Sequence, residues 1–360
     1  MSLATYKTEL KSLLEQKLKA CRVVVMPDFF LDRVVNLKWD VVEFSRLVAE
    51  VANRKGGSLD GIAQTDQRGG NAINVAAALT RLGVQVTPIV CTSKFGLEQI
   101  KYHFHDTPID TSHIKTHGKA SITTALEFKN QNEKTNVMLR DLGELADFGP
   151  ANLDERDYAL IDDTDYVCVF NWAGTLRFGI ELAQAVFEWT KQVGKGKTYY
   201  DTADPTPKAK EMPDLMKKVL KANIVDILSL NENEAIAYAS LFDDGLMDKK
   251  ERLGFAELAM EAARVLAKRL PARIDLHSTV FSATLKGKKE VVAPTFKVRV
   301  LRATGAGDAW NAGNIVGDHN GFSDECRLTL ANAVSACYLS DADGVHPKKE
   351  KLSAFLRDYV

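Results

Sequence analysis

The stretch Thr304-Gly305-Ala306-Gly307-Asp308, which continues as Ala309-Trp310-Asn311-Ala312-Gly313, is the feature on which the interpretation of this sequence depends. A strand-like run from Phe296 to Leu301 precedes it, and a helix is expected to follow it. Two glycines at the beginning of a helix allow backbone N–H groups to point at an anion, and the helix dipole favours negative charge there. The stretch therefore predicts a phosphate-binding turn with Asp308 beside it.

Asp308 adds chemistry to this turn. An ionised carboxylate repels a resting phosphate, but it can accept a proton from an attacking hydroxyl. The pairing therefore indicates phosphoryl transfer. Helix capping alone also explains a G-x-G-D turn, because many strand-to-helix turns carry two glycines and an acidic residue in the first helical turn. Other parts of the chain have to decide between the two interpretations.

Composition narrows the class of protein. The chain has 360 residues, 45% of them hydrophobic, which is enough for one large α/β domain or two ordinary ones. Its 47 basic and 48 acidic residues leave a net charge of −1, so we expect neither nucleic acid nor a membrane as a partner. No apolar run is long enough to span a bilayer, and residues 1–20 are too charged for a signal peptide, so a cytoplasmic location is expected.

The cysteines agree with a reducing compartment. They are odd in number, widely spaced and without a CxxC pair, which is typical of buried thiols and unlike disulfides or a zinc site. The five are Cys21, Cys91, Cys168, Cys326 and Cys337.

Two acidic residues follow the first predicted strand, Arg22–Met26. Pro27 breaks that strand, and Asp28 and Asp32 come directly after it. Ligands of open α/β sheets bind at strand ends, so both carboxylates are candidates to accept hydrogen bonds from substrate hydroxyls. The alternative is a pair of solvated loop acids.

A second helix opened by glycines begins after Gly69 and Gly70. The small residues from Asn71 to Leu79 favour a helix that packs very close to a neighbour. The two glycines would let a ligand approach the backbone, and Asn74 offers a donor and an acceptor one turn inside the helix. An interior asparagine satisfied by backbone is the alternative.

A hairpin is predicted from Ser121–Phe128 and Thr135–Arg140. Two strands alone are marginal in water, so we expect pairing with Gly57–Arg68 in a small sheet that could cover a site. Arg140 hints at an acidic substrate, although an arginine on the surface of a hairpin is commoner. An exposed apolar face of this sheet could be shared between two subunits in a homodimer.

After Pro150 strands and helices alternate regularly, which predicts a mostly parallel sheet with helices on both faces. Asn231 and Glu234 lie at one strand end and would face the same way on the first turn of a helix. Their oxygens suit Mg²⁺, held mainly through water and nucleotide phosphates. A capping pair is the alternative, and it is the commoner arrangement. Asp201 and Asp204 also follow a strand end and are assigned only weakly.

With these parts placed, the sequence resembles the ribokinase-like (PfkB) family of carbohydrate kinases. The motifs that carry the resemblance are Gly69–Gly83 (GGNAINVAAALTRLG) and Ala303–Gly313 (ATGAGDAWNAG), together with Asn231–Glu234 and Asn332 in the last long helix. The resemblance implies a three-layer αβα sandwich with a mostly parallel central sheet and a small β-sheet lid. The whole of 1–360 would be one kinase domain, with the lid inserted at about 54–68 and 118–142.

The resemblance also implies an ATP-dependent kinase that uses Mg²⁺ and acts on a sugar or sugar-like substrate. Asp308 would be the base, and the turn residues would form an anion hole for the transferred group. The resemblance implies that Asp32, Gly70 and Asn74 bind the substrate, and the residue patterns described above add Asp28, Gly69 and Arg140 as candidates. The anion hole is assigned to Gly305, Ala306 and Gly307, nucleotide contacts to Thr304 and Asn332, and the metal to Asn231 and Glu234.

The sequence departs from the family pattern at three places, which bear on the phosphoryl donor and its affinity more than on the fold. Pro27 replaces a glycine before the substrate aspartate, Arg302 replaces the aspartate that commonly opens the late motif, and His277–Leu285 lacks the usual Gly-x-x-Gly. A nucleoside kinase of the same fold and a non-catalytic ligand-binding relative therefore stay open as alternatives.

Overall fold

The computed structural model of the chain describes residues 3–130, 133–243, 245, 246, 248, 252–302 and 304–359. Its main sheet has eight strands in the order β12-β11-β10-β9-β8-β7-β1-β4. The strands from β10 to β4 are parallel, and β11 and β12 are antiparallel additions at one edge. The strands are β1 (Arg22–Met26), β4 (Gln85–Pro88), β7 (Tyr166–Phe170), β8 (Lys197–Asp201), β9 (Ile227–Leu230), β10 (Arg273–His277), β11 (Phe281–Lys286) and β12 (Lys289–Pro294).

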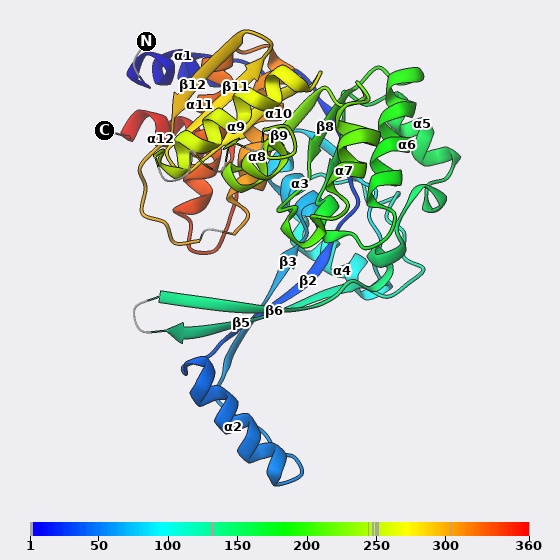
Figure 1. Cartoon of the computed structure of the whole chain (residues 1–360), viewed down its shortest axis with the longest axis vertical. Coiled ribbons are helices and arrows are strands. Elements are labelled where there is room, and N and C mark those ends of the chain that lie inside the picture. The colour runs from blue at the N-terminus through cyan, green and yellow to red at the C-terminus, as the bar shows by residue number, and fades with distance from the viewer. Residues whose placement is uncertain are drawn as a thin grey trace.

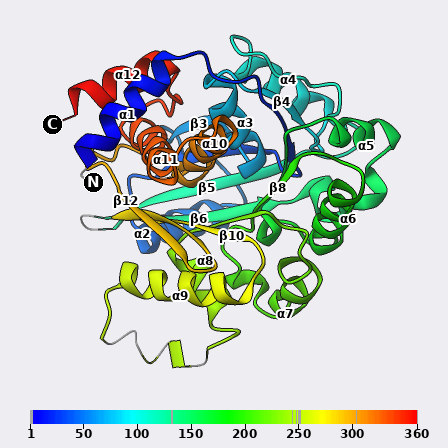
Figure 2. The same cartoon turned by 90° about the horizontal axis from the view of Figure 1, so that it is seen from above.

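Helices cover both faces of this sheet, as Figure 2 shows from above. One face is covered by α5 (Glu155–Asp162), α6 (Gly179–Gln192), α7 (Met212–Leu215), α8 (Glu232–Ala239) and α9 (Phe255–Arg269). The other is covered by α1 (Leu3–Glu15), α3 (Asn71–Arg81), α4 (Lys94–His103), α10 (Ala306–Asn320), α11 (Asp324–Leu339) and α12 (Lys349–Asp358).

The strand sequences explain why both faces are covered. In β7 Val167 and Val169 belong to the core on one side, whereas Tyr166, Cys168 and Phe170 belong to the core on the other. A strand buried on both faces has to be apolar throughout. The prediction of a three-layer αβα architecture with a mostly parallel sheet is confirmed. All five cysteines are free and buried, as expected.

A second sheet of four strands, ordered β3-β2-β5-β6, stands away from the main body (Figure 1). Its strands are β2 (Phe30–Asn36), β3 (Ala63–Gly69), β5 (Ser121–Asn130) and β6 (Glu133–Asp141), and α2 (Val41–Asn53) projects from its far end. The predicted hairpin is β5 and β6, but its partner is β2, which lies between β5 and β3. The sequence predicts no strand after Pro27, because a proline followed by two aspartates is typical of a loop.

The run Phe296–Leu301 is not a strand, which corrects the expectation for the approach to α10. The sheet ends with β12 at Pro294, and the chain then crosses to the C-terminal helices. Phe296 packs edge-on against Phe355, with ring centroids 5.1 Å apart, and the Leu301 amide donates to the Leu339 carbonyl. These contacts replace strand pairing. Among the described residues no helix is both long and apolar enough to cross a membrane.

Candidate functional site

The two helices opened by glycines meet at their N-termini. Both begin at a glycine with a positive φ, 93° at Gly70 before α3 and 89° at Gly305 before α10, a conformation that L-residues with side chains rarely adopt. Asn74 Nδ2 donates to Asp308 Oδ2 over 3.0 Å, although the two residues are 234 positions apart in the chain. The fold therefore brings the two motifs into one site.

Asp308 is buried at this junction. Burial is the main reason that its pKa is raised well above the usual value, and the nearby charge of Asp201 raises it further, while hydrogen bonds from Asn74 and Asn71 act in the opposite direction. A carboxylate with a raised pKa is a stronger base than a solvated one. Asn71 was not singled out from the sequence, because a polar first residue of a helix has no distinctive signal.

The backbone at the start of α10 presents three N–H groups at the helix N-terminus. Among the described residues, none accepts a hydrogen bond from the amides of Ala306, Gly307 or Asp308. Thr304 is exposed, and its carbonyl accepts from Tyr338 Oη over 2.9 Å. Three N–H groups that lack an acceptor in the described part of the chain lie at the positive end of a helix dipole, where they can receive an anion.

His277, at the end of β10, faces this turn. A Cβ at Gly307 would lie 3.2 Å from His277 Cε1, and the imidazole packs against Trp310 with ring centroids 5.1 Å apart. Burial lowers the pKa of His277 to about 4, and its Nε2 has no hydrogen-bond partner among the described residues. A neutral imidazole therefore lies beside the free amides. The sequence marked this segment only by its missing glycines.

Asp32 and Arg140 lie together on the small sheet. Asp32 pairs in register with Thr123 on β5, which in turn pairs with Arg140 on β6. The Arg140 guanidinium is 4.9 Å from the centre of the Phe30 ring. Burial raises the pKa of Asp32, whereas the hydrogen bond with Thr123 and the charge of Arg140 lower it. Asp32 Oδ1 has no partner among the described residues, so it remains available as an acceptor.

The two glycines before α3 are required by close contacts. A Cβ at Gly69 would lie 2.0 Å from Asp32 Oδ2, and one at Gly70 would lie 2.7 Å from the Asp28 carbonyl oxygen. Gly69 therefore makes room for the Asp32 carboxylate. Gly70 lets the β1–β2 connection pass directly over the beginning of α3.

Asp28 holds this connection in place. Its carboxylate accepts from the amides of Asn71 and Ala72, each over 2.9 Å, and from Asn171 Nδ2 over 2.7 Å. The residue has no exposed surface. Burial excludes the alternative of a solvated loop acid. The carboxylate caps α3, because the α3 amides point at it, and a contact with substrate stays a prediction.

Asn231 and Glu234 form a reciprocal capping box at the start of α8. The Glu234 amide donates to Asn231 Oδ1 over 3.0 Å, and Glu234 accepts from the Asn231 amide and side chain over 2.8 and 2.7 Å. Glu234 is buried, and burial followed by the charge of Asp201 raises its pKa well above the usual value. The capping alternative is what the geometry contains, and a metal role for the pair stays a prediction.

Asp201 lies between these groups. It accepts from Asn311 Nδ2 over 2.7 Å, and its charge raises the pKa of both Asp308 and Glu234. The sequence assigned Asp201 only weakly, since a strand-end aspartate is common. Asp201 therefore interacts electrostatically with both other buried carboxylates, which makes this side of the site electronegative.

Asn332 has a structural position. Its Oδ1 accepts from Trp310 Nε1 over 2.9 Å, and its Nδ2 donates to the Pro294 carbonyl over 3.0 Å. Both of its polar groups are engaged and the side chain is buried. In this structure Asn332 links α10, α11 and β12, and the nucleotide contact expected of it stays a prediction.

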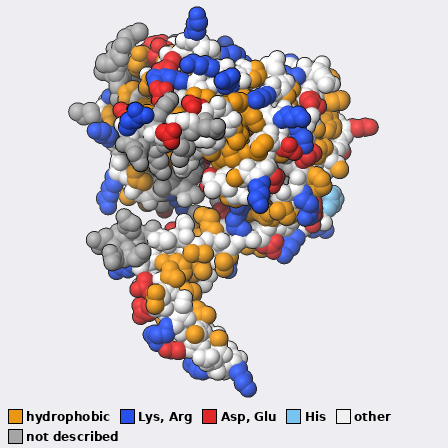
Figure 3. Space-filling model, viewed as in Figure 1, with side chains coloured by type: hydrophobic (Ala, Val, Ile, Leu, Met, Phe, Trp, Pro, Cys, Tyr) orange, Lys and Arg blue, Asp and Glu red, His pale blue; other side chains and the backbone are white. Residues whose placement is uncertain are grey.

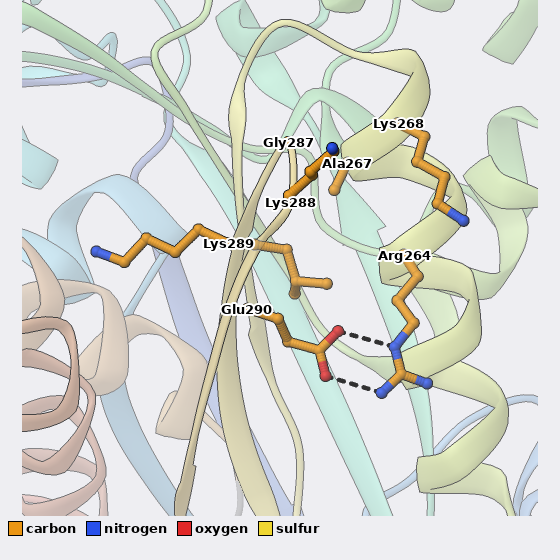
Figure 4. Close-up of a pocket in the computed structure, with 8 residues that line it drawn as sticks. Arg264, Ala267, Lys268, Gly287, Lys288, Lys289 and Glu290 are labelled. Atoms are coloured by element: carbon orange, nitrogen blue, oxygen red, sulfur yellow. Dashed lines mark hydrogen bonds and ion pairs between the residues drawn. The ribbon is translucent and has the colours of Figure 1, made fainter.

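A separate surface pocket lies between α9 and the turn joining β11 to β12 (Figure 4). Arg264 donates to both carboxylate oxygens of Glu290, each over 2.8 Å, across it. Leu285, which lines this pocket, pairs with Ile274 near the start of β10, whereas His277 is the last residue of that strand. The pocket therefore lies at the opposite end of the strands from His277 and the α10 amides. We assign no part of the site to it.

Comparison with known proteins identifies the family and the fold of the chain. The family model described as pfkB family carbohydrate kinase matches residues 40–351. No curated protein sequence matches the chain. Many solved structures are similar. Adenosine kinase from Sinorhizobium meliloti superposes with a TM-score of 0.69 at 15% identity, covering 95% of this chain and 100% of that one.

Two ribokinases superpose equally well. The enzyme from Cryptococcus neoformans var. grubii serotype A, in complex with ADP, has a TM-score of 0.70 at 15% identity over 93% of this chain and 99% of that one. Arabidopsis thaliana ribokinase, complexed with ribose and ATP, has a TM-score of 0.69 at 16% identity over 94% and 99%. Identities this low show the common ribokinase-like fold alone, whereas the family model covers most of the sequence. The chain therefore belongs to the pfkB family of carbohydrate kinases.

Proposed function

We propose that the protein transfers a phosphoryl group from ATP to a hydroxyl of a sugar or sugar-like substrate, with Asp308 as the general base. The observation that carries the proposal is the contact between Asn74 and Asp308, beside three helix amides for which no described residue is the acceptor. An acceptor held at α3 and an anion held at α10 would place the attacking oxygen and the transferred group next to one carboxylate.

Asp308 supports this role through its environment. The hydrogen bond from Asn74 fixes one carboxylate oxygen, Oδ2, so that the other can face the acceptor hydroxyl. The raised pKa brings the proton affinity of the carboxylate closer to that needed for taking a proton from a hydroxyl. The amides of Ala306, Gly307 and Asp308 would stabilise the charge on the transferred group.

Acceptor binding is assigned to Asp32, Asn74 and Arg140, with Gly69 and Gly70 giving the space. The free Oδ1 of Asp32 supports this assignment, since a buried acceptor without a partner is suited to a substrate hydroxyl. The Arg140 guanidinium lies over the Phe30 ring, on the same small sheet as Asp32, and could contact the far end of the acceptor. Asp28 acts by positioning α3.

Mg²⁺ would be held near Asn231, Glu234 and Asp201. Burial raises the pKa of both Glu234 and Asp201, and the charge of Asp201 raises that of Glu234 further. A divalent cation would stabilise the ionised form of both carboxylates, which supports the assignment. When bound, the ion would neutralise charge on the nucleotide phosphates. Because Glu234 is engaged by Asn231, contact through water is the arrangement that fits these residues. Thr304, exposed beside the turn, is the nucleotide contact that we retain.

A non-catalytic ligand-binding relative is the second candidate. The packing of His277 against Gly307 favours it, because the imidazole takes space beside the free amides. Incubating the protein with ATP and Mg²⁺ and a panel of sugars, sugar acids and nucleosides, with product detected by mass spectrometry, separates the two. Transfer to a nucleoside alone would support the nucleoside kinase alternative, and the absence of any product would support the non-catalytic one.

We also infer that the small sheet closes as a lid and pairs two copies of the chain. Ile122, Val137, Met138 and Leu139 are exposed on it, and Figure 3 shows apolar side chains gathered there. An apolar sheet surface of this kind is protected when a second copy covers it. Sedimentation of the protein at several concentrations tests the dimer, and a monomer at all of them would contradict it.

A further inference from the structure

Two arginines near the site lack a carboxylate partner. Arg68 is the second-last residue of β3, and Arg302 precedes the glycine turn of α10. Within the described part of the chain neither forms an ion pair, and Arg68 Nε has no hydrogen-bond partner. Arg302 Nη2 donates to the neutral side chain of Gln67 over 2.6 Å. Partly buried arginines are usually matched by an acid, so these two call for an anion.

The surroundings of the two arginines are built from buried polar groups. A Cβ at Gly344 would lie 2.0 Å from Arg302 Nη1, so this glycine admits the guanidinium. His346 is only 4% exposed, stacks on Tyr338 with ring centroids 4.5 Å apart, and leaves its Nδ1 without a partner among the described residues. An unpartnered nitrogen in a buried ring needs a group to bind.

Arg68, Arg81 and Arg302 together create a positive electrostatic potential around His346. Burial lowers the pKa of Arg68, and the charges of Arg302 and Arg81 lower it further, although Tyr338 and Asp308 act in the opposite direction. Burial, followed by the charges of Arg68, Arg81 and Arg302, also lowers the pKa of His346 well below its usual value.

The neighbouring acids are already matched. Arg81 pairs with Asp106 over 2.8 Å, and Asp341 pairs with Lys351 over 2.8 Å. Asp308 accepts its hydrogen bond from Asn74. The charges of Arg68 and Arg302 therefore repel each other, and the charge of Asp308 offsets this repulsion for Arg68 only in part, which is unfavourable in a partly desolvated place.

We propose that Arg68 and Arg302, together with His346, form a binding site for an oxyanion, separate from the free amides of α10. Guanidinium groups present parallel N–H donors that match the oxygens of a phosphate or a carboxylate. Since Asp308 lies within electrostatic range of Arg68, the oxyanion would sit close to the transfer site. It could be an acidic group of the acceptor itself or a free anion.

Inorganic phosphate is the probe, added to the full chain at constant ionic strength without nucleotide. The readout is the ¹⁵N spectrum of histidine-labelled protein, with His346 reporting on the proposed site and His277 reporting on the α10 amides. His346→Gln and His277→Gln assign the signals. The variants are Arg68→Met and Arg302→Met. Arg33→Met is the control, because Arg33 is an exposed arginine of the same small sheet that is paired with Asp66.

We expect phosphate to shift the His346 signals saturably in the wild type and in the control. Each of Arg68→Met and Arg302→Met should weaken the apparent affinity by about tenfold or more, the loss expected for one charge-assisted hydrogen bond. Phosphate that moves only the His277 signals, fails to move any signal, or binds both variants as tightly as the wild type would overturn the proposal.

Replacing phosphate by gluconate, fructose 6-phosphate or neutral fructose identifies the source of the oxyanion. A response to an acidic sugar at lower concentration than to phosphate means that the acceptor supplies the group. A response to phosphate alone means that a free anion binds there. The measurement needs no turnover, so its failure would leave the proposed role of Asp308 untouched, and failure of catalysis would leave this site untouched.

Discussion

Replacing Asp308 by asparagine separates its chemical role from its structural one. The substitution keeps the shape of the side chain, and a carboxamide oxygen can still accept the hydrogen bond from Asn74 Nδ2. The ability to take a proton is lost, together with one of the two acceptor oxygens, which Asn71 also uses as a hydrogen-bond partner. Positioned general bases contribute about 10²–10⁴ in rate, or roughly 3–5 kcal/mol of activation free energy. We expect kcat to fall at least 100-fold by this reasoning, with the acceptor KM little changed.

Asp308→Asn should stabilise the folded protein even though it lowers kcat. The pKa of Asp308 is raised in the folded state, so the folded protein binds this proton more tightly than the unfolded chain does. Once the pH is above the unfolded pKa, ionisation costs folding free energy, and the cost grows up to the folded pKa. Asp308→Asn removes that cost, so its Tm at neutral pH should equal or exceed the Tm of the wild type. The difference should vanish in acid.

Asp318 on the same helix is the matched control. It accepts from Tyr166, Lys197 and Arg273, and its pKa is lowered, mainly by the charge of Arg273 acting against burial. Asp318→Asn should therefore lower Tm and leave kcat of the folded enzyme near normal. Thermal unfolding followed by circular dichroism and a coupled assay of ADP release measure both quantities. An Asp308→Asn enzyme within tenfold of the wild-type kcat would refute the assignment of the base.

Three further predictions follow from the same geometry. Gly69→Ala places a Cβ 2.0 Å from Asp32 Oδ2 and should raise the acceptor KM by about tenfold or more through displacement of this carboxylate, which steady-state kinetics on the best acceptor would detect. Arg327→Met removes a buried partner of Asp275 and should lower the free energy of unfolding by about 3 kcal/mol in urea titrations at neutral pH, with turnover per folded molecule unchanged. Because the pKa of Asp275 is lowered in the folded state, this stabilisation exists above its unfolded pKa and is lost as the pH falls through the folded pKa, so a difference that persists in strong acid would contradict the reasoning. Chelation of divalent cations should stop transfer and added Mg²⁺ should restore it, whereas full activity in chelator would remove the metal from the proposal.

The fold could be predicted from the sequence wherever the spacing of apolar residues reflects their burial. Apolar strands such as Tyr166–Phe170 and the small-residue helix Asn71–Arg81 carry local patterns that one kind of environment produces. The pattern failed where an element depends on its neighbours. Phe30–Asn36 became a strand because it pairs with β3 on one side and β5 on the other, and Phe296–Leu301 lost strand structure because the C-terminal helices take up its contacts.

Within the site, the sequence by itself determined which groups are capable of the chemistry. Glycine at 70 and 305, the carboxylate at 308 and the amide at 74 are recognisable because few residues satisfy those backbone and hydrogen-bonding demands. Tertiary structure alone decided how polar groups are matched. It turned the Asp28 carboxylate inward to cap a helix and gave Arg68 no ion-pair partner among the described residues. Hydrogen-bond and ion-pair partners come from segments far apart in the chain, and no local pattern encodes them.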